Sequence, residues 1–182
     1  MPEYLDVEVS LDGATPRIWR RFLIEERATF MDLHEAIQTA CGWGNYHLFV
    51  FRTRDREEVA GLPDDFGFGD DPSPDAAEVL AGPHLREHGT VAYEYDFGDG
   101  WEHTVKLKGI ETIDETFRRR LLDGARAFPP EDCGGIGGYE DAVAVAAGGE
   151  AQYHDTDELR EWLGDWDPEA FDLEAARSVF DG

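Results

Sequence analysis

The sequence YEYDFGDGWEHTVKL occupies residues 93–107 and predicts the central hairpin of the fold. Aromatic and acidic residues alternate before a Gly-Asp-Gly turn, and polar and apolar residues alternate after it, which is the period of half-buried strands. A three-residue Gly-Asp-Gly loop would place Phe97 opposite Trp101, so that one face of the ribbon is apolar and the other charged. We therefore predict a β-hairpin with this register.

The predicted register also brings two acidic side chains together. Asp96 would lie opposite Glu102, and like charges that face each other across a ladder are unfavourable. His103 would lie opposite Tyr95, at the edge of the aromatic face. Asp96 and His103 are therefore candidates for a binding site, although carboxylates also fall together by chance in a chain this acidic.

Other periodic stretches lie on the N-terminal side of the hairpin. Alternating apolar residues predict strands at 4–11, 17–24 and 47–54, of which the first two form a second hairpin. A helix is predicted between them and the third strand, because Thr29 and Asp32 resemble a capping box and Gly42 is a natural helix end. Strands and helices thus share the first half of the chain.

The remaining segments are richer in loops and helices. A long acidic loop is expected at about 61–90, with room for one helical turn near 75–81. The other predicted elements are a short helix at 112–124, an irregular loop at 125–139, a helix at 139–149, a helix capped by Asp155 and Glu158, and a last helix beginning at Asp167-Pro168. This order predicts a single α+β domain over residues 1–182, with a largely antiparallel or mixed sheet of about five or more strands and helices packed on one face.

The charge of the chain is extreme. It carries 41 Asp and Glu but only 16 Lys and Arg, which gives a formal net charge of −25. Such like charge repels itself at ordinary ionic strength and is screened in molar salt, so an acidic, Lys-poor chain indicates adaptation to high salt. The alternative is an acidic protein with a cationic partner. The charge gives nucleic acid no support as a ligand, although at high salt it does not exclude it.

The hydrophobic pattern and the cysteine content indicate where the protein is located. No apolar run approaches the roughly 20 residues that span a bilayer, and the N-terminal residues lack the pattern of a secretory signal. The two cysteines, Cys41 and Cys133, do not suggest a disulfide framework. We therefore expect a cytoplasmic protein with no membrane partner.

Taken in order, several segments resemble the plasmid pRiA4b ORF-3-like family. They are PRIWRRFLI, TFMDLHEAIQTACGW with HLFVF, YEYDFGDGWEHTVKL, PPEDCGGIGGY and WDPEAFDLEAA, spread over about residues 3–180. The resemblance implies a single α+β domain and a link with plasmids and transposable elements, but no known reaction. Relatives typically carry two more cysteines, where this chain has Leu121 and Phe128. Only Cys133 remains of the three, so a thiolate-rich metal site is not expected here.

Nine residues in these segments are candidate ligand or cleft residues: His34, His47, Asp96, Asp99, Trp101, His103, Glu131, Asp132 and Cys133. A divalent metal, if one is bound, would be held by His34, His47, Asp96 and His103, since imidazole and carboxylate groups are common metal ligands. Each has an ordinary structural alternative as well. The histidines would pack at the edge of a core, and Asp99 is a residue type that is common in Gly-Asp-Gly turns. Cys133 lacks the flanking signature of a nucleophile.

Three functions follow, in this order. The first is a non-catalytic accessory protein of mobile elements that binds an unknown ligand or protein partner. The second is a metal-assisted hydrolase with Glu131 or Asp132 assisting the metal ligands, which requires the histidines to converge. The third is a protein-interaction module that uses exposed aromatic residues such as Trp19, Trp43 and Trp166.

Overall fold

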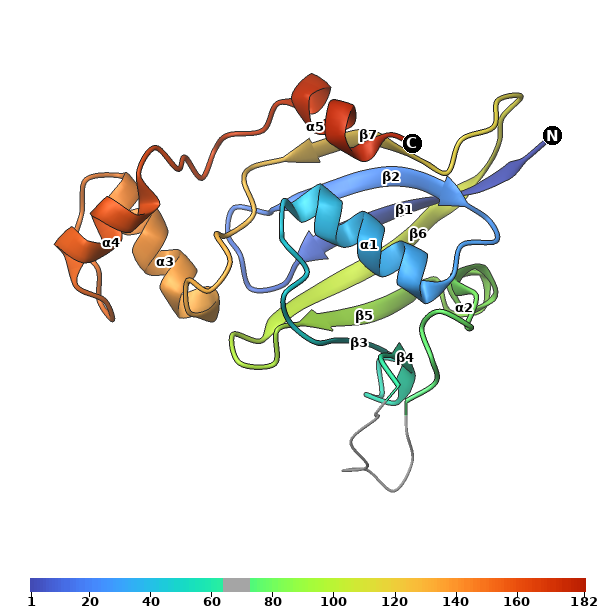
Figure 1. Cartoon of the computed structure of the whole chain (residues 1–182), viewed down its shortest axis with the longest axis horizontal. Helices are drawn as coiled ribbons and strands as arrows, with labels where there is room; N and C mark the ends of the chain where they lie inside the picture. Colours follow the sequence, from blue (N-terminus) through green and yellow to red (C-terminus); the bar gives the residue numbers. More distant parts are fainter. Residues whose placement is uncertain (64–72) are drawn as a thin grey trace.

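The fold is one seven-stranded antiparallel sheet with five helices, as a computed structural model of residues 1–63 and 73–182 shows (Figure 1). The order across the sheet is β4-β3-β5-β6-β1-β2-β7. The strands are β1 (Glu3–Leu11), β2 (Trp19–Glu25), β3 (Phe49–Arg52), β4 (Glu58–Gly61), β5 (Thr90–Tyr95), β6 (Trp101–Thr112) and β7 (Arg119–Ala125). The predicted α+β class is confirmed.

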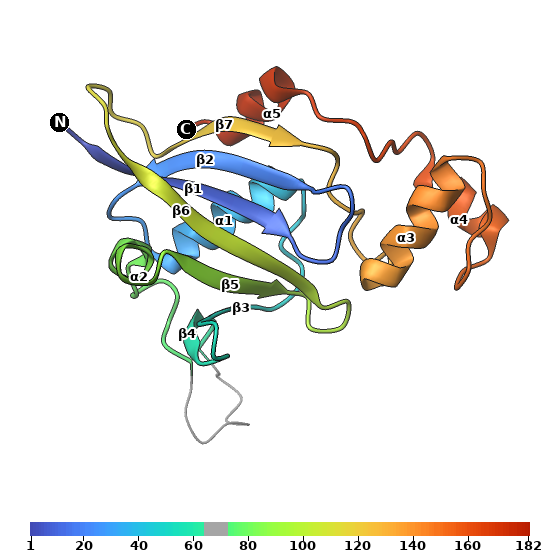
Figure 2. The same cartoon turned by 180° about the vertical axis from the view of Figure 1, so that it is seen from behind.

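The helices cover one face and one end of this sheet. They are α1 (Phe30–Cys41), α2 (Ala81–His88), α3 (Gly135–Ala146), α4 (Thr156–Leu163) and α5 (Leu173–Phe180). Seen from behind, the strands lie in front of α1, while α3 and α4 sit beyond the end of the sheet (Figure 2). α5 contacts both α1 and β7. Within the described ranges, each helix is too short or too polar to cross a membrane.

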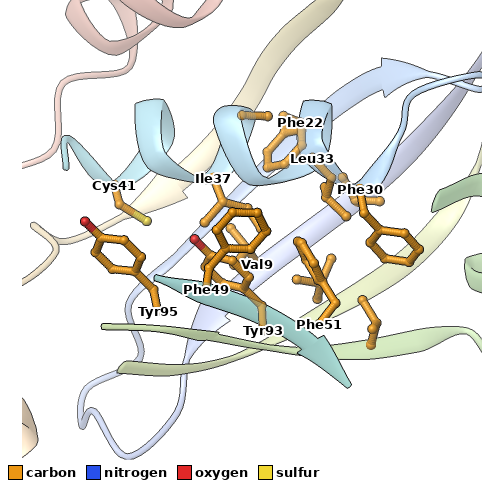
Figure 3. Packing of buried hydrophobic residues seen from close by; sticks show 14 of the residues in the cluster. Val9, Phe22, Phe30, Leu33, Ile37, Cys41, Phe49, Phe51, Tyr93 and Tyr95 are labelled. Atoms are coloured by element: carbon orange, nitrogen blue, oxygen red, sulfur yellow. The ribbon is translucent and has the colours of Figure 1, made fainter. Parts of the chain in front are cut away.

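The core lies between α1 and the sheet. Phe30, Leu33 and Ile37 point from the helix toward the aromatic residues of β3 and β5 (Figure 3). Phe30 and Phe51, for example, have ring centroids 4.8 Å apart. Burying each large side chain contributes roughly 1.5–3 kcal/mol. This packing fixes the C-terminal end of α1, from which the chain enters the candidate site.

The capping pattern of α1 is confirmed. The Thr29 hydroxyl accepts a hydrogen bond from the Asp32 backbone N–H at 3.1 Å, and the Asp32 carboxylate accepts one from the Thr29 N–H at 2.8 Å. Gly42 ends the helix with φ 73°, in the left-handed region that glycine adopts without strain. Local sequence therefore sets both ends of this helix.

The predicted hairpin exists, but its predicted register is wrong by two residues. Tyr95 pairs with Trp101 and Tyr93 pairs with His103, which leaves a five-residue turn at 96–100. Asp96 belongs to this turn and has φ 57°, and its Oδ1 accepts the backbone N–H of Gly98 at 3.1 Å. A shift of two residues leaves every side chain on its predicted face, so the alternating pattern did not distinguish the two registers.

The corrected register replaces one pair of facing acids by another. Glu94, not Asp96, lies opposite Glu102. Arg52 forms an ion pair with Glu94, and Arg56 donates to Glu102 at 3.1 Å. Each carboxylate thus has its own arginine, which offsets the repulsion between the two acids.

Four segments differ from the predicted elements. α3 begins at Gly135, inside the expected irregular loop at 125–139 and four residues before the predicted helix at 139–149. Residues 112–124 were expected to form a helix, but β7 occupies the C-terminal part of this segment and pairs with β2, because Leu121 is buried in the sheet core and tertiary contacts override local preference. The last helix is capped by Asp172 rather than starting at Asp167-Pro168. In the expected acidic loop at 61–90, α2 forms, and residues 64–72 lie outside the described part.

Candidate functional site

Three connections meet at the end of the sheet next to α3: residues 43–47, the turn 96–100 and the loop 129–135. Glu131 ties the loop 129–135 to residues 43–47 and to the end of β5. Its carboxylate accepts hydrogen bonds from the Gly44 N–H at 2.6 Å and from the Tyr95 hydroxyl at 2.7 Å. Desolvation and Glu131 raise the pKa of Tyr95, so this hydroxyl stays a donor. Both Glu131 oxygens are therefore engaged in holding the connections together.

The turn is tied to the same loop by backbone contacts. The Asp99 carboxylate accepts the Gly134 N–H at 3.1 Å. Gly135 has φ 69°, and a Cβ there would lie 2.5 Å from the Asp99 carbonyl oxygen. Glycine is thus required where α3 begins, and the loop is held against the turn.

The three connections bring one cluster of possible metal ligands together. His47 Nε2 lies 2.8 Å from Asp132 Oδ1 and 3.6 Å from Asp96 Oδ2. One ligand atom from each residue falls within 4.8 Å of the others, and this is the one such group of three among the described residues. Asp96 and Asp132 both have positive φ values, 57° and 61°. The cluster joins two residues of the predicted metal set, His47 and Asp96, with Asp132.

His34 lies in the core, away from this cluster. Its Nε2–H donates to Asn45 Oδ1 at 2.8 Å, and its Nδ1 accepts from the Tyr93 hydroxyl at 2.8 Å. Its ring stacks on Phe49 at 3.6 Å between centroids. Desolvation by burial lowers the pKa of His34 to about 4, so the ring is neutral and fully engaged at neutral pH.

His103 is also fully buried. Its Nδ1 lies 3.3 Å from the Tyr93 carbonyl oxygen, while its Nε2 has no hydrogen-bond partner among the described residues. Burial lowers the pKa of His103 to about 4. Trp43 and Phe128 pack around its ring, and Phe128 stands where relatives are expected to carry a cysteine. The structure thus leaves His34 and His103 outside the cluster of possible ligands.

The remaining candidates divide between core and surface. Trp101 is buried and its ring centroid lies 5.9 Å from that of Trp43, so both are core residues rather than the exposed aromatics of an interaction surface. Trp19 and Trp166 are half-buried. Cys133 is 4% exposed. Desolvation, followed by the charge of Asp99, raises the pKa of its thiol to about 12, so it stays protonated and is a poor nucleophile.

A pocket lies beside the cluster and is called here the α4 pocket. Its volume is about 350 Å³, and it is lined by Asp132, Cys133, His154, Asp155, Glu158, Leu159 and Trp162. Trp162 is 52% exposed. His154 is held in place because its Nδ1 lies 2.8 Å from the buried carboxylate of Asp141. Asp132 belongs to both the pocket and the His47–Asp96–Asp132 cluster.

Sequence reasoning missed most of the α4 pocket. Asp132 and Cys133 were among the candidates, but Trp162 was not, and Asp155 and Glu158 were predicted only to cap their helix. Asp155 is indeed the N-cap, since its side chain accepts two backbone N–H groups of α4. One signal was present: a short helix with three acidic residues and a tryptophan in its last turn.

Comparisons with known proteins agree with one another. The family model described as plasmid pRiA4b ORF-3-like protein matches residues 3–175. An uncharacterized protein, y4hQ of Sinorhizobium fredii, is 36% identical over 163 residues, which cover 88% of this chain and 81% of that protein. The crystal structure of MM3350, a protein of unknown function from Methanosarcina mazei Go1, has a TM-score of 0.80 at 32% identity and covers 96% of both chains.

Proposed function

The chain belongs to the plasmid pRiA4b ORF-3-like family, and on this premise we propose that it is a non-catalytic protein that binds a basic partner segment in the α4 pocket. The association with plasmids and transposable elements that the family name suggests is part of this proposal. So are a cytoplasmic location and adaptation to high salt. The observation that carries the binding role is the composition of the pocket wall.

The wall of the α4 pocket suits an organic cation. Asp132, Asp155 and Glu158 contribute three carboxylates, and the described lining contains no Lys or Arg. The half-exposed ring of Trp162 offers an aromatic face, which attracts guanidinium and ammonium groups by about 0.5–2 kcal/mol. A Lys or Arg side chain of a partner would therefore meet charge and aromatic surface together.

The state of the candidate catalytic groups supports a non-catalytic role. The Cys133 thiol is buried and protonated, the two core histidines are neutral, and both oxygens of Glu131 accept hydrogen bonds. General base and nucleophilic catalysis need such groups to be free and within reach of a substrate. In the described part of this site, His47 is the one histidine among the candidates that reaches solvent.

The binding role is tested with a labelled Gly-Arg repeat peptide in about 2 M KCl, where nonspecific charge attraction is screened. Fluorescence anisotropy should show saturable binding that a Gly-Gln repeat lacks. Trp162→Ala should weaken binding about 3- to 30-fold, the value of a cation–π contact. Glu158→Gln should also weaken it.

Glu161→Gln is the matched control for this experiment. Glu161 is exposed on the same helix but does not line the pocket, so the variant loses the same charge without changing the wall. Equal effects of Glu158→Gln and Glu161→Gln would reduce the binding to general charge attraction and contradict the proposal. Metal-dependent hydrolysis of phosphoesters or amides that His47→Gln abolishes would contradict the non-catalytic role.

A further inference from the structure

The structure points to a divalent-cation site formed by His47, Asp96 and Asp132, and we propose that it takes a first-row transition ion such as Mn²⁺. This site shares Asp132 with the wall of the α4 pocket, whereas His47 and Asp96 do not line that pocket. Substitutions of His47 and Asp96 therefore test the ion site, and Trp162→Ala and Glu158→Gln test the pocket.

The first observation is geometric. Three potential ligand atoms, one imidazole nitrogen and two carboxylate oxygens, lie within 4.8 Å of one another. Ligands around one ion that are each about 2.1 Å from it lie at most about 4.2 Å apart, so a small adjustment brings the three into one coordination sphere. Asp132 is exposed, which leaves the remaining positions of the ion open to water. A mixed set of one imidazole and two carboxylates suits Mn²⁺ better than Ca²⁺ or a thiolate-seeking ion.

The second observation is a carboxylate oxygen that lacks a donor and belongs to a largely buried residue. Asp96 is only 8% exposed. Its Oδ1 accepts backbone N–H groups of the turn, but its Oδ2 has no hydrogen bond within the described residues and points at His47 Nε2, 3.6 Å away. The single proton on that nitrogen is already directed to Asp132 at 2.8 Å. This oxygen is incompletely satisfied by the protein, and a cation beside it would supply the missing partner.

The third observation is the charge around the cluster. Asp96, Asp99, Glu131 and Asp132 all belong to the meeting connections, and none forms an ion pair with a Lys or Arg in the described structure. Four carboxylates near one histidine create a negative potential that an ion would neutralise. When the ion binds, His47 Nε2 must give up its proton, either to Nδ1 or to solvent, because coordination uses the nitrogen lone pair.

The test uses chelator-treated full-length protein and Mn²⁺ alone as the probe. An electron paramagnetic resonance titration should show one tightly bound Mn²⁺ per chain. The pulsed spectrum of the bound ion should show coupling to a directly coordinated imidazole nitrogen, and His47→Gln should remove this coupling. Asp96→Asn should weaken binding by at least about 10-fold, because even outer-shell partners of a metal are worth that much.

Asp99→Asn is the matched control. Asp99 belongs to the same turn and loses the same charge, but its side chain accepts from Gly134 and is not part of the cluster. Asparagine retains an acceptor oxygen at either position, so both variants are expected to fold, which thermal unfolding would verify. Absence of bound Mn²⁺, absence of imidazole coupling, or equal losses in Asp96→Asn and Asp99→Asn would each overturn the proposal. Binding lost only in Asp96→Asn and His47→Gln supports it.

Discussion

At the scale of single residues, burial decides which histidines belong to the structure and which to the site. His34 of α1 and His103 of β6 both lie in the aromatic core, and burial lowers both pKa values to about 4. His47 has the same chemistry but lies in an exposed connection, where it contacts two carboxylates. The sequence does not distinguish these three candidate histidines, and their burial separates them.

The buried histidines predict how stability depends on pH. The folded-state pKa of His103 is below the usual value near 6.5, so between about pH 6.5 and about pH 4 the unfolded chain binds a proton that the folded chain does not. The stability of the folded chain is therefore unaffected by His103 above that window, and it decreases as the pH falls through the window. From pH 7 to about pH 5, His103 alone should cost about 2 kcal/mol of unfolding free energy.

This prediction is checked by urea unfolding of the wild type and His103→Phe at both pH values. Phenylalanine cannot titrate. The substitution should cost little stability at pH 7, because Nδ1 of His103 makes one long hydrogen bond and Nε2 makes none among the described residues. The variant should therefore lose less stability on acidification than the wild type. His88→Gln serves as the control, because His88 is exposed. An unchanged pH dependence in His103→Phe would contradict a neutral buried ring.

At the scale of elements, the sequence predicts local features well and pairing less well. The capping box at Thr29, the helix end at Gly42 and the alternating faces of the hairpin are set by neighbouring residues, and all are present. The hairpin register was missed by two residues because the alternating pattern repeats every two residues. Asp96 decides it by adopting a positive φ in the turn, which alternation does not reveal.

The corrected register predicts a charge coupling between β3 and β5. Arg52→Gln would leave Glu94 facing Glu102 without its arginine, and should lower the unfolding free energy by about 1 kcal/mol. Glu94→Gln added to that variant should recover much of the loss, because the facing like charges are then gone. Urea unfolding of the single and double variants gives the coupling energy.

Arg54→Gln is the control for this cycle. Arg54 is exposed in the same connection and has no ion pair among the described residues, so its loss removes the same charge without affecting the hairpin. A double variant no more stable than Arg52→Gln alone would argue against the observed pairing of Glu94 with Glu102.

At the scale of the whole molecule, the site is made by connections that the sheet brings together. Residues 43–47, 96–100 and 129–135 are far apart in the chain, and each carries candidates that the sequence singled out. Which candidates meet depends on how the loop before α3 docks on the turn, through Asp99, Gly134 and Gly135. Because that docking is a tertiary contact, the sequence indicated which segments carry candidates but not that His47 contacts Asp132.

The distributed negative charge predicts a salt requirement. With 41 acidic against 16 basic residues, repulsion should destabilise the folded chain in about 0.1 M KCl, where the Debye length is about 10 Å, and much less in about 2 M KCl, where it is below about 3 Å. Urea unfolding should therefore give a higher unfolding free energy in the higher salt. A sucrose solution of equal osmolality that produced the same gain would indicate solute exclusion instead of screening.

The central claim is that a basic segment binds in the α4 pocket, and the most direct test follows the five tryptophan indole N–H signals by NMR during titration with the Gly-Arg peptide in about 2 M KCl. The Trp162 signal, assigned with Trp162→Phe, should shift progressively and saturate. The signals of the buried Trp43 and Trp101 should stay in place. A peptide that binds without moving the Trp162 signal, or that does not bind, would contradict the account.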